Sequence, residues 1–154
     1  MALALAEARG AALAGEVPVG AVIVRDGEII ARAANRTVRD QEATAHAEIL
    51  AIREACRITG SWRLSGCTLF VTLEPCAMCA GAIVLARLDR VVFAAWDDKA
   101  GMSGSVGDLL RHPKLNHRPA VQGGFDADAS SALLRAFFGA RRGRDFVDTP
   151  VTGT

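Results

Sequence analysis

Helical and extended hydrophobic patterns alternate along this chain. Apolar positions recur at helical spacing in several stretches, and β-branched or apolar runs of strand length separate them. The expected helices cover residues 2–14, 44–58, 75–86 and 126–139, with a short one at 106–110. The expected strands cover residues 19–24, 28–33, 68–73, 90–95 and 120–122. The resulting order is helix, hairpin, helix, strand, helix, strand, loop, strand and helix. It predicts an α/β fold with a mixed sheet covered on both faces.

Turn and cap residues mark the ends of these elements. Asp26 and Gly27 separate the first two strands and favour a tight hairpin. Thr44 is a suitable cap for the second helix, which Gly60 ends. Pro75 suits the first turn of the third helix. Two helices have a predicted core face, made of Ile49, Ile52 and Cys56 in one, and Ala132, Leu133, Ala136 and Phe137 in the other.

Length and composition favour one compact cytoplasmic domain. The chain has 154 residues, 51% of them apolar, and no internal repeat. It has no run of about 18 consecutive apolar residues, so no membrane span is expected. The first residues lack the basic and long apolar regions of a signal peptide. We expect a domain over residues 1–144 and a flexible tail over 145–154.

The net charge of +1 does not by itself predict a nucleic-acid-binding protein. Two basic clusters could nevertheless contact phosphates. Ordinary solvated helix faces explain each cluster equally well. One cluster comprises Arg135, Arg141, Arg142 and Arg144, and the other Arg111, His112, Lys114, His117 and Arg118.

A split set of metal ligands gives the strongest functional information. His46 and Glu48 are followed, 28 positions after Glu48, by Cys76 and then Cys79. Zinc is normally tetrahedral, so three protein ligands leave one position for water, which is typical of a catalytic site. Glu48 is a natural proton carrier beside the ligand histidine. The order H-x-E…P-C-x-x-C is typical of zinc-dependent nucleobase deaminases.

The individual residues also have simpler interpretations. Cys76 and Cys79 alone could form a redox pair, but a thioredoxin-like motif needs no distant His-x-Glu. His46 alone could be a buried core histidine, and Glu48 a solvated helix residue. At the start of a helix, the positive dipole end would instead stabilise Cys76 and Cys79 as thiolates. The other two cysteines, 56 and 67, are interpreted as small buried residues.

Stretches outside this motif extend the pattern. Two of these stretches, 44–49 and 71–82, surround the metal-ligand motif. The others are residues 16–22, 35–36, 90–93, 115–118 and 137–138. Over roughly its first 142 residues the chain resembles the bacterial tRNA-specific adenosine deaminases of the cytidine/deoxycytidylate deaminase superfamily. The resemblance implies a cytidine-deaminase-like, three-layer α/β/α sandwich with a five-stranded mixed sheet. It also implies a homodimer with one Zn²⁺ per subunit. The implied reaction is hydrolytic deamination of adenosine to inosine at the wobble position of an arginine tRNA anticodon.

The same resemblance assigns roles to single residues. His46, Cys76 and Cys79 are the implied zinc ligands, and Glu48 is the implied proton shuttle. Substrate-binding residues are expected to be Asn35, Ala47, Asp97 and Lys99. Asn35 would hydrogen-bond the target nucleotide, Ala47 would wall its base, and the other two would contact RNA.

The substrate-binding residues could also have purely structural roles. Asn35 or Asp97 could stabilise a turn, and Lys99 could be an ordinary solvated side chain. Three residues differ from what the resemblance leads us to expect: Trp96, Asp98 and Met102. All three lie in the predicted RNA-contacting loop. Asp98 adds a negative charge that repels phosphate, and Trp96 could either stack on a base or only pack.

Two other functions share these residues. A deaminase of a free nucleobase or nucleoside, such as guanine or cytosine, would use the same zinc ligands. A non-catalytic subunit with a structural zinc would be expected to lose the proton carrier, and Glu48 is present. The stretches 115–118 and 137–138 favour the tRNA enzyme over the free-base deaminase.

Overall fold

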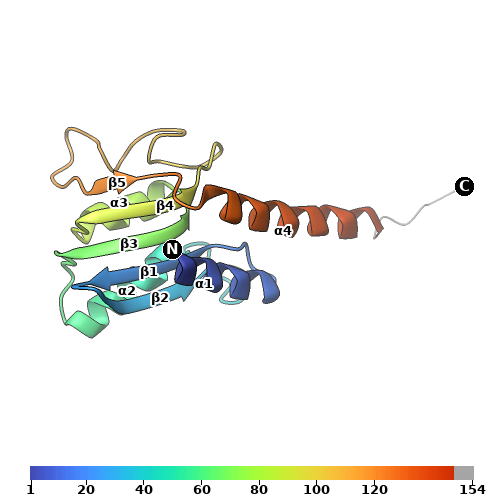
Figure 1. Ribbon diagram of the computed structural model, residues 1–154, viewed down its shortest axis with the longest axis horizontal. Helices are drawn as coiled ribbons and strands as arrows, with labels where there is room; N and C mark the ends of the chain where they lie inside the picture. The colour runs from blue at the N-terminus through green and yellow to red at the C-terminus, as the bar shows by residue number, and fades with distance from the viewer. Residues whose placement is uncertain (148–154) are drawn as a thin grey trace, which may run out of the picture.

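The computed structural model describes the backbone of residues 1–147 and the side chains of residues 1–144. Its elements follow the predicted order (Figure 1). They are α1 (Ala2–Leu13), β1 (Gly20–Arg25), β2 (Glu28–Ala34), α2 (Ala47–Thr59), β3 (Cys67–Leu73), α3 (Ala77–Leu85), β4 (Arg90–Ala95), β5 (Ala120–Gln122) and α4 (Ala127–Val147).

The five strands form one mixed sheet in the order β2-β1-β3-β4-β5. β1 is antiparallel to both β2 and β3, whereas β3, β4 and β5 run parallel. The predicted hairpin is confirmed. Asp26 and Gly27 have φ values of 50° and 77°, and positive φ at both central residues is what a type I′ turn requires.

Helices cover both faces of the sheet, which confirms the three-layer sandwich (Figure 1). α2 and α3 pack on one face, where the main core contains Ile23, Leu69, Phe93, Ile52 and Ile83. α1 and α4 pack on the other face and contact each other. β2 and β3 are both antiparallel to β1, so their C-terminal ends lie at the same end of the sheet. The segments that follow them carry the predicted site and meet there.

Two predicted boundaries are wrong at the site. Thr44 does not cap α2, because its hydroxyl donates to the Glu42 carboxylate and the helix begins at the N-cap His46. Pro75 is not in the first turn of α3, because Cys76 is the N-cap of that helix. In both cases the helix begins later than the local sequence indicates.

The predicted short helix at 106–110 is absent, because its backbone bonds to the segment before it. Ser103 forms an antiparallel bridge with Asp108, and the N–H of Leu109 donates to the carbonyl of Met102. These bonds replace the local turns of a helix. The segment from 97 to 110 is therefore one folded loop.

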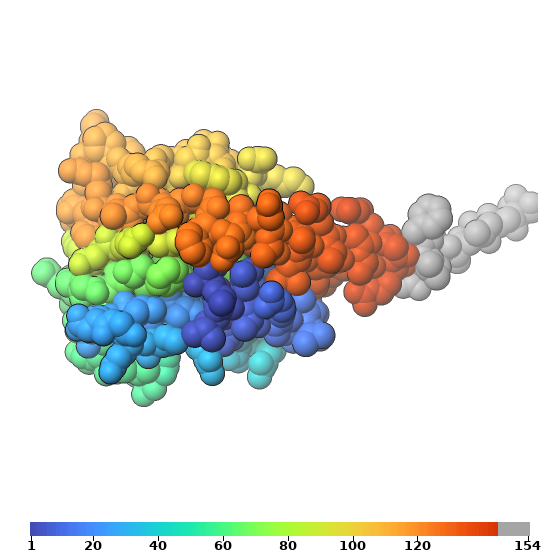
Figure 2. All heavy atoms as spheres, viewed as in Figure 1, coloured from blue at the N-terminus to red at the C-terminus, as the bar shows by residue number. Residues whose placement is uncertain are grey.

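The predicted core faces of α2 and α4 are partly wrong. Ile49 and Cys56 are only partly buried, and α2 packs mainly through small residues such as Ala51 and Ala55. In α4, Phe137 is buried but Ala132 and Ala136 are exposed. Figure 2 shows α4 running outward past the sheet beside α1, so much of its surface faces solvent.

The domain boundary at residue 144 stays a prediction. α4 continues to Val147, and residues 148–154 of the expected tail lie outside the described residues. Among residues 1–147, no helix combines the length and apolar character needed to cross a membrane.

Candidate metal and catalytic site

Two helices begin at residues of the predicted metal site. His46 is the N-cap of α2 and Cys76 the N-cap of α3, both with extended backbone and neither with a side-chain capping bond. Their side chains are therefore free to leave the helix axis. Cys79 lies in the first turn of α3. The His46 Nδ1 atom is 3.7 Å from the Cys76 Sγ atom and 3.5 Å from the Cys79 Sγ atom.

The three donor atoms lie within 4.8 Å of one another, which suits a single metal ion. One imidazole nitrogen and two sulfurs form a donor set that zinc prefers. The electrostatics fit as well. A hydrogen bond from Cys79 is the largest cause that lowers the pKa of Cys76 to about 4, and the same bond and burial raise the pKa of the Cys79 thiol. Without a metal ion, the two sulfurs together carry one negative charge. A bound divalent cation would favour two thiolates.

Glu48 is a buried carboxylate beside this donor set. It is 4% exposed and lies in the first turn of α2, where its carboxylate interacts electrostatically with His46 and Cys76. Burial is the largest cause that raises its pKa to about 6. His46 and Glu48 are two residues apart, a spacing that separates side chains on a helix. They meet here because His46 lies at the cap, outside the helical turns.

Asn35 joins the end of β2 to the start of α2. Its side-chain oxygen accepts a hydrogen bond from the Ala47 N–H at 3.0 Å, and the residue is 8% exposed. Asn35 therefore supplies the cap that His46 does not. Its amide nitrogen makes no hydrogen bond to the described residues and keeps its donors. Ala47 is fully buried between His46 and Glu48.

A second buried carboxylate, Glu74, fastens the loop that follows β4. Its Oε2 accepts from the N–H of Asp97 at 3.0 Å, and its Oε1 accepts from Ser103 at 3.3 Å and Ser105 at 3.0 Å. The side chain is 1% exposed. Sequence reasoning missed this residue, because its partners lie 23 to 31 positions away and leave no local pattern.

The same loop is tied directly to the start of α3. The N–H of Met102 donates to the Pro75 carbonyl at 2.8 Å, and Gly101 forms an antiparallel bridge with Cys76. A methyl group at Gly101 would collide with the Glu74 carboxylate. Position 101 is therefore restricted to glycine by this close approach.

The predicted RNA-contacting residues of this loop have structural roles or are exposed. The Asp97 Oδ1 accepts from the N–H groups of Lys99 and Ala100, so the turn role of Asp97 is observed. The Lys99 side chain is exposed. Met102 packs against the core, whereas Trp96 is 51% exposed and meets Phe93 edge to face at 4.8 Å. Their contacts with RNA stay predictions.

The two basic clusters are partly engaged within the protein. In the cluster over residues 111–118, Arg111 pairs with Asp108, and the His117 ring nitrogen lies 2.6 Å from the Leu88 carbonyl oxygen. In the α4 cluster, the Arg141 guanidinium lies over the Phe137 ring. Contacts of either cluster with phosphate stay predictions.

Comparisons with known proteins agree on one family. Residues 1–95 match the model of the cytidine and deoxycytidylate deaminase zinc-binding region. The tRNA-specific adenosine deaminase of Bacillus subtilis is 52% identical over 88% of this chain and 84% of its own length. A solved structure from work on A-to-I editing by tRNA:A34 deaminases has a TM-score of 0.84 and 48% identity, covering 87% of this chain and 97% of the other.

A guanine deaminase from Bacillus subtilis is less similar. Its structure has a TM-score of 0.62 and 35% identity, covering 92% of this chain and 90% of the other.

The first prediction concerns the metal ligands. Cys79→Ser should lose most of its bound zinc, because a hydroxyl is a far weaker zinc ligand than a thiolate. Cys56→Ser is the matched control, since Cys56 is a free, partly buried cysteine outside the donor set. Zinc content by atomic absorption should fall only in the first variant. Equal zinc in both variants would contradict the assignment.

The second prediction concerns Glu74. Glu74→Gln replaces one acceptor with an amide N–H₂ that faces backbone donors, which should cost about 1–3 kcal/mol of unfolding free energy. Denaturant unfolding measures this loss, and the amide protons of Asp97, Ser103 and Ser105 should exchange faster. The control Glu28→Gln, at an exposed position, should change stability by less than about 0.5 kcal/mol. Unchanged protection of the three amides would rule out the anchoring role.

Proposed function

The chain belongs to the cytidine and deoxycytidylate deaminase family, among its tRNA-specific adenosine deaminases, and we propose that it converts adenosine to inosine at the wobble position of a tRNA. One observation carries the proposal. A buried carboxylate lies beside a three-donor metal site in a chain that is 52% identical to a tRNA-specific adenosine deaminase. The overall reaction consumes one water and releases one ammonia.

The residues have distinct tasks in this reaction. His46, Cys76 and Cys79 would hold the zinc ion, which when bound acts as a Lewis acid that activates the attacking water. Glu48 accepts a proton from the water as the water attacks the ring carbon that bears the amino group. It delivers this proton to the ring nitrogen next to that carbon and then assists the departure of ammonia. A carboxylate suits both directions of proton transfer. Its burial beside Cys79 keeps bulk water from competing for the proton.

The substrate-binding residues fit the same scheme. The free amide N–H groups of Asn35 would hold the target nucleotide, since its oxygen is already committed to Ala47. Ala47 would support the base from beneath, since it is fully buried and its N–H holds the Asn35 side chain. Asp97 and Lys99, on the loop that Glu74 fastens, would contact RNA near the target. The arginine tRNA anticodon is the proposed substrate.

A free-base deaminase is the second candidate, because the chain is also similar to the guanine deaminase of Bacillus subtilis, at 35% identity. The higher identity to a tRNA-specific enzyme favours the first function. A non-catalytic role is disfavoured by the buried Glu48, since a structural zinc needs no carboxylate beside it.

The deciding experiment is a deamination assay with zinc-loaded protein. Its substrates are an arginine-tRNA anticodon stem-loop with a wobble adenosine, free adenosine, cytosine and guanine. Inosine should form only in the stem-loop. Glu48→Gln should keep zinc and lose turnover by about a hundredfold or more, because the proton carrier is removed. Turnover of a free base with an untouched stem-loop would move the protein to nucleobase metabolism.

We also propose a cytoplasmic homodimer. Large apolar side chains stay exposed near the ends of α2 and α3, where Ile58 is 52%, Trp62 61% and Leu85 70% exposed. A second copy of the chain would bury them. Sedimentation at micromolar concentration should show a dimer, and Leu85→Glu should shift it toward monomer. A parent protein that sediments only as monomer would contradict the proposal.

A further inference from the structure

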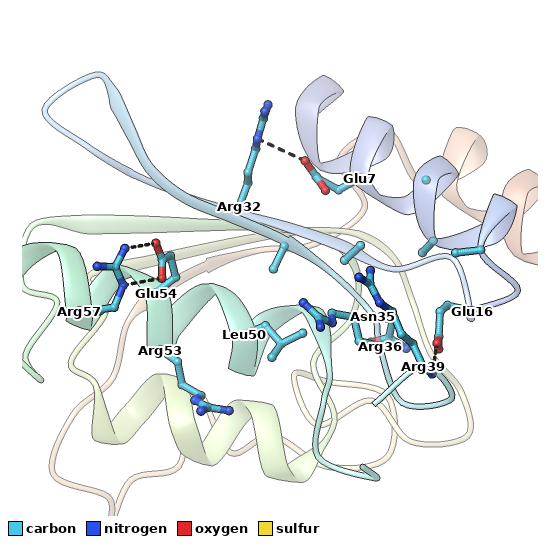
Figure 3. A pocket seen from close by; sticks show the side chains of 15 residues that line it. Glu7, Glu16, Arg32, Asn35, Arg36, Arg39, Leu50, Arg53, Glu54 and Arg57 are labelled. Carbon is cyan, nitrogen blue, oxygen red and sulfur yellow. Dashed lines mark hydrogen bonds and ion pairs between the residues drawn. The ribbon is translucent and has the colours of Figure 1, made fainter. Parts of the chain in front are cut away.

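A cleft lined by arginines runs along the outer edge of the sheet. It has a volume of about 630 Å³ and follows β2 between α1 and α2 (Figure 3). Five arginines from β2, the segment after it and α2 line it. They are Arg32, Arg36, Arg39, Arg53 and Arg57. They are spread over 26 positions of sequence, and only the fold collects them in one cleft.

Two of the three glutamates in the lining form exposed ion pairs. Glu7 lies 3.3 Å from Arg32, and Glu54 lies 2.6 Å from Arg57. The arginine side chains of these pairs are 60% and 71% exposed. Exposed pairs of this kind contribute only about 0–1 kcal/mol, so a phosphate can compete for the guanidinium groups.

The third glutamate, Glu16, is buried and holds the backbone of the segment after β2. Its carboxylate accepts from the N–H of Val38 at 3.1 Å and of Arg39 at 2.6 Å. Glu16 therefore fixes the position of Arg39 without pairing with its guanidinium. Arg39 and Arg53 have no carboxylate within ion-pair distance among the described residues. Arg36 pairs with Asp40, at 3.0 Å.

The cleft adjoins the proposed catalytic site through Asn35. Asn35 lines the cleft, and its side-chain oxygen holds the N–H of Ala47, the residue between His46 and Glu48. Figure 3 shows Asn35, Arg36 and Arg39 grouped at the same end of β2. A nucleotide held by Asn35 would thus have its chain neighbours at the mouth of the cleft.

We propose that this cleft binds the sugar–phosphate backbone of the RNA that flanks the target adenosine. The proposal rests on the proposed function. The planar guanidinium group matches phosphate geometry with two parallel hydrogen bonds, which favours arginine at such sites. The binding is to backbone and carries no sequence preference. It supplies affinity, while Asn35 and Glu48 act on the base.

The test removes the two arginines that lack a carboxylate partner. Arg39→Gln and Arg53→Gln, singly and together, are compared with Arg25→Gln, which removes the same charge from the far end of β1. Both cleft arginines are exposed, so the variants should fold like the parent. The measured quantities are kcat and KM on the anticodon stem-loop, each over a series of salt concentrations.

Each cleft variant should raise KM and leave kcat unchanged at saturating RNA. The slope of log KM against log salt should fall by about 1 per arginine removed, since each phosphate contact releases about one counterion. Stem-loops with altered stem sequence should be affected equally. Arg25→Gln should leave the slope unchanged.

Two results would overturn the assignment, and they are distinguishable from failure of the proposed function. Unchanged salt slopes in both cleft variants, with inosine formed normally, would show that the cleft does not hold RNA. A shift of the variants from dimer to monomer in sedimentation, again with unchanged slopes, would make the cleft an interface between two copies. Absence of inosine with the parent protein would instead reject the proposed function itself, and the cleft assignment with it.

Discussion

The site depends on two helices that begin at metal ligands. A residue at an N-cap has extended backbone, so its side chain points away from the helical turns, where His46 and Cys76 can reach a common ion. This use of the cap has a cost, because the first N–H groups of a helix then need another acceptor. Asn35, the residue that follows β2, meets that need at α2. The hydrogen bond that orients Asn35, the proposed nucleotide-binding residue, thus also caps α2 and leaves the His46 side chain available to the donor set.

Buried carboxylates then fix the loops on either side of the metal site. Glu16 holds the segment after β2 through two backbone N–H groups, and Glu74 holds the loop after β4 through three. Burying a carboxylate is unfavourable unless hydrogen bonds compensate, and several backbone donors provide that compensation. The two loops are therefore held by tertiary contacts and not by regular secondary structure. The charged side chains of the two loops can therefore bind a ligand.

Local spacing explains what the sequence alone could predict. The hairpin follows from Asp26 and Gly27, and the metal donors follow from the pattern around His46 and Cys76, because each depends on near neighbours or on a fixed motif. The errors have the opposite origin. Thr44 was a suitable cap by residue type, but Asn35, which follows β2 and lies 12 positions before Ala47, has that role. Glu74 has partners more than twenty positions away, and the arginines of the cleft look like ordinary surface residues until β2 and α2 are placed together.

Net charge is a poor guide to this protein's attraction for RNA, because the negative charges are unevenly buried. Three carboxylates, Glu16, Glu48 and Glu74, are buried among the described residues, whereas no arginine or lysine is. Without these three negative charges, the net charge of +1 becomes +4 for the rest of the chain. They face backbone donors or metal ligands and cannot meet a phosphate at contact distance. A nearly neutral chain can thus present a locally positive surface to a polyanion, and a positively charged cleft raises the local concentration of its ligand.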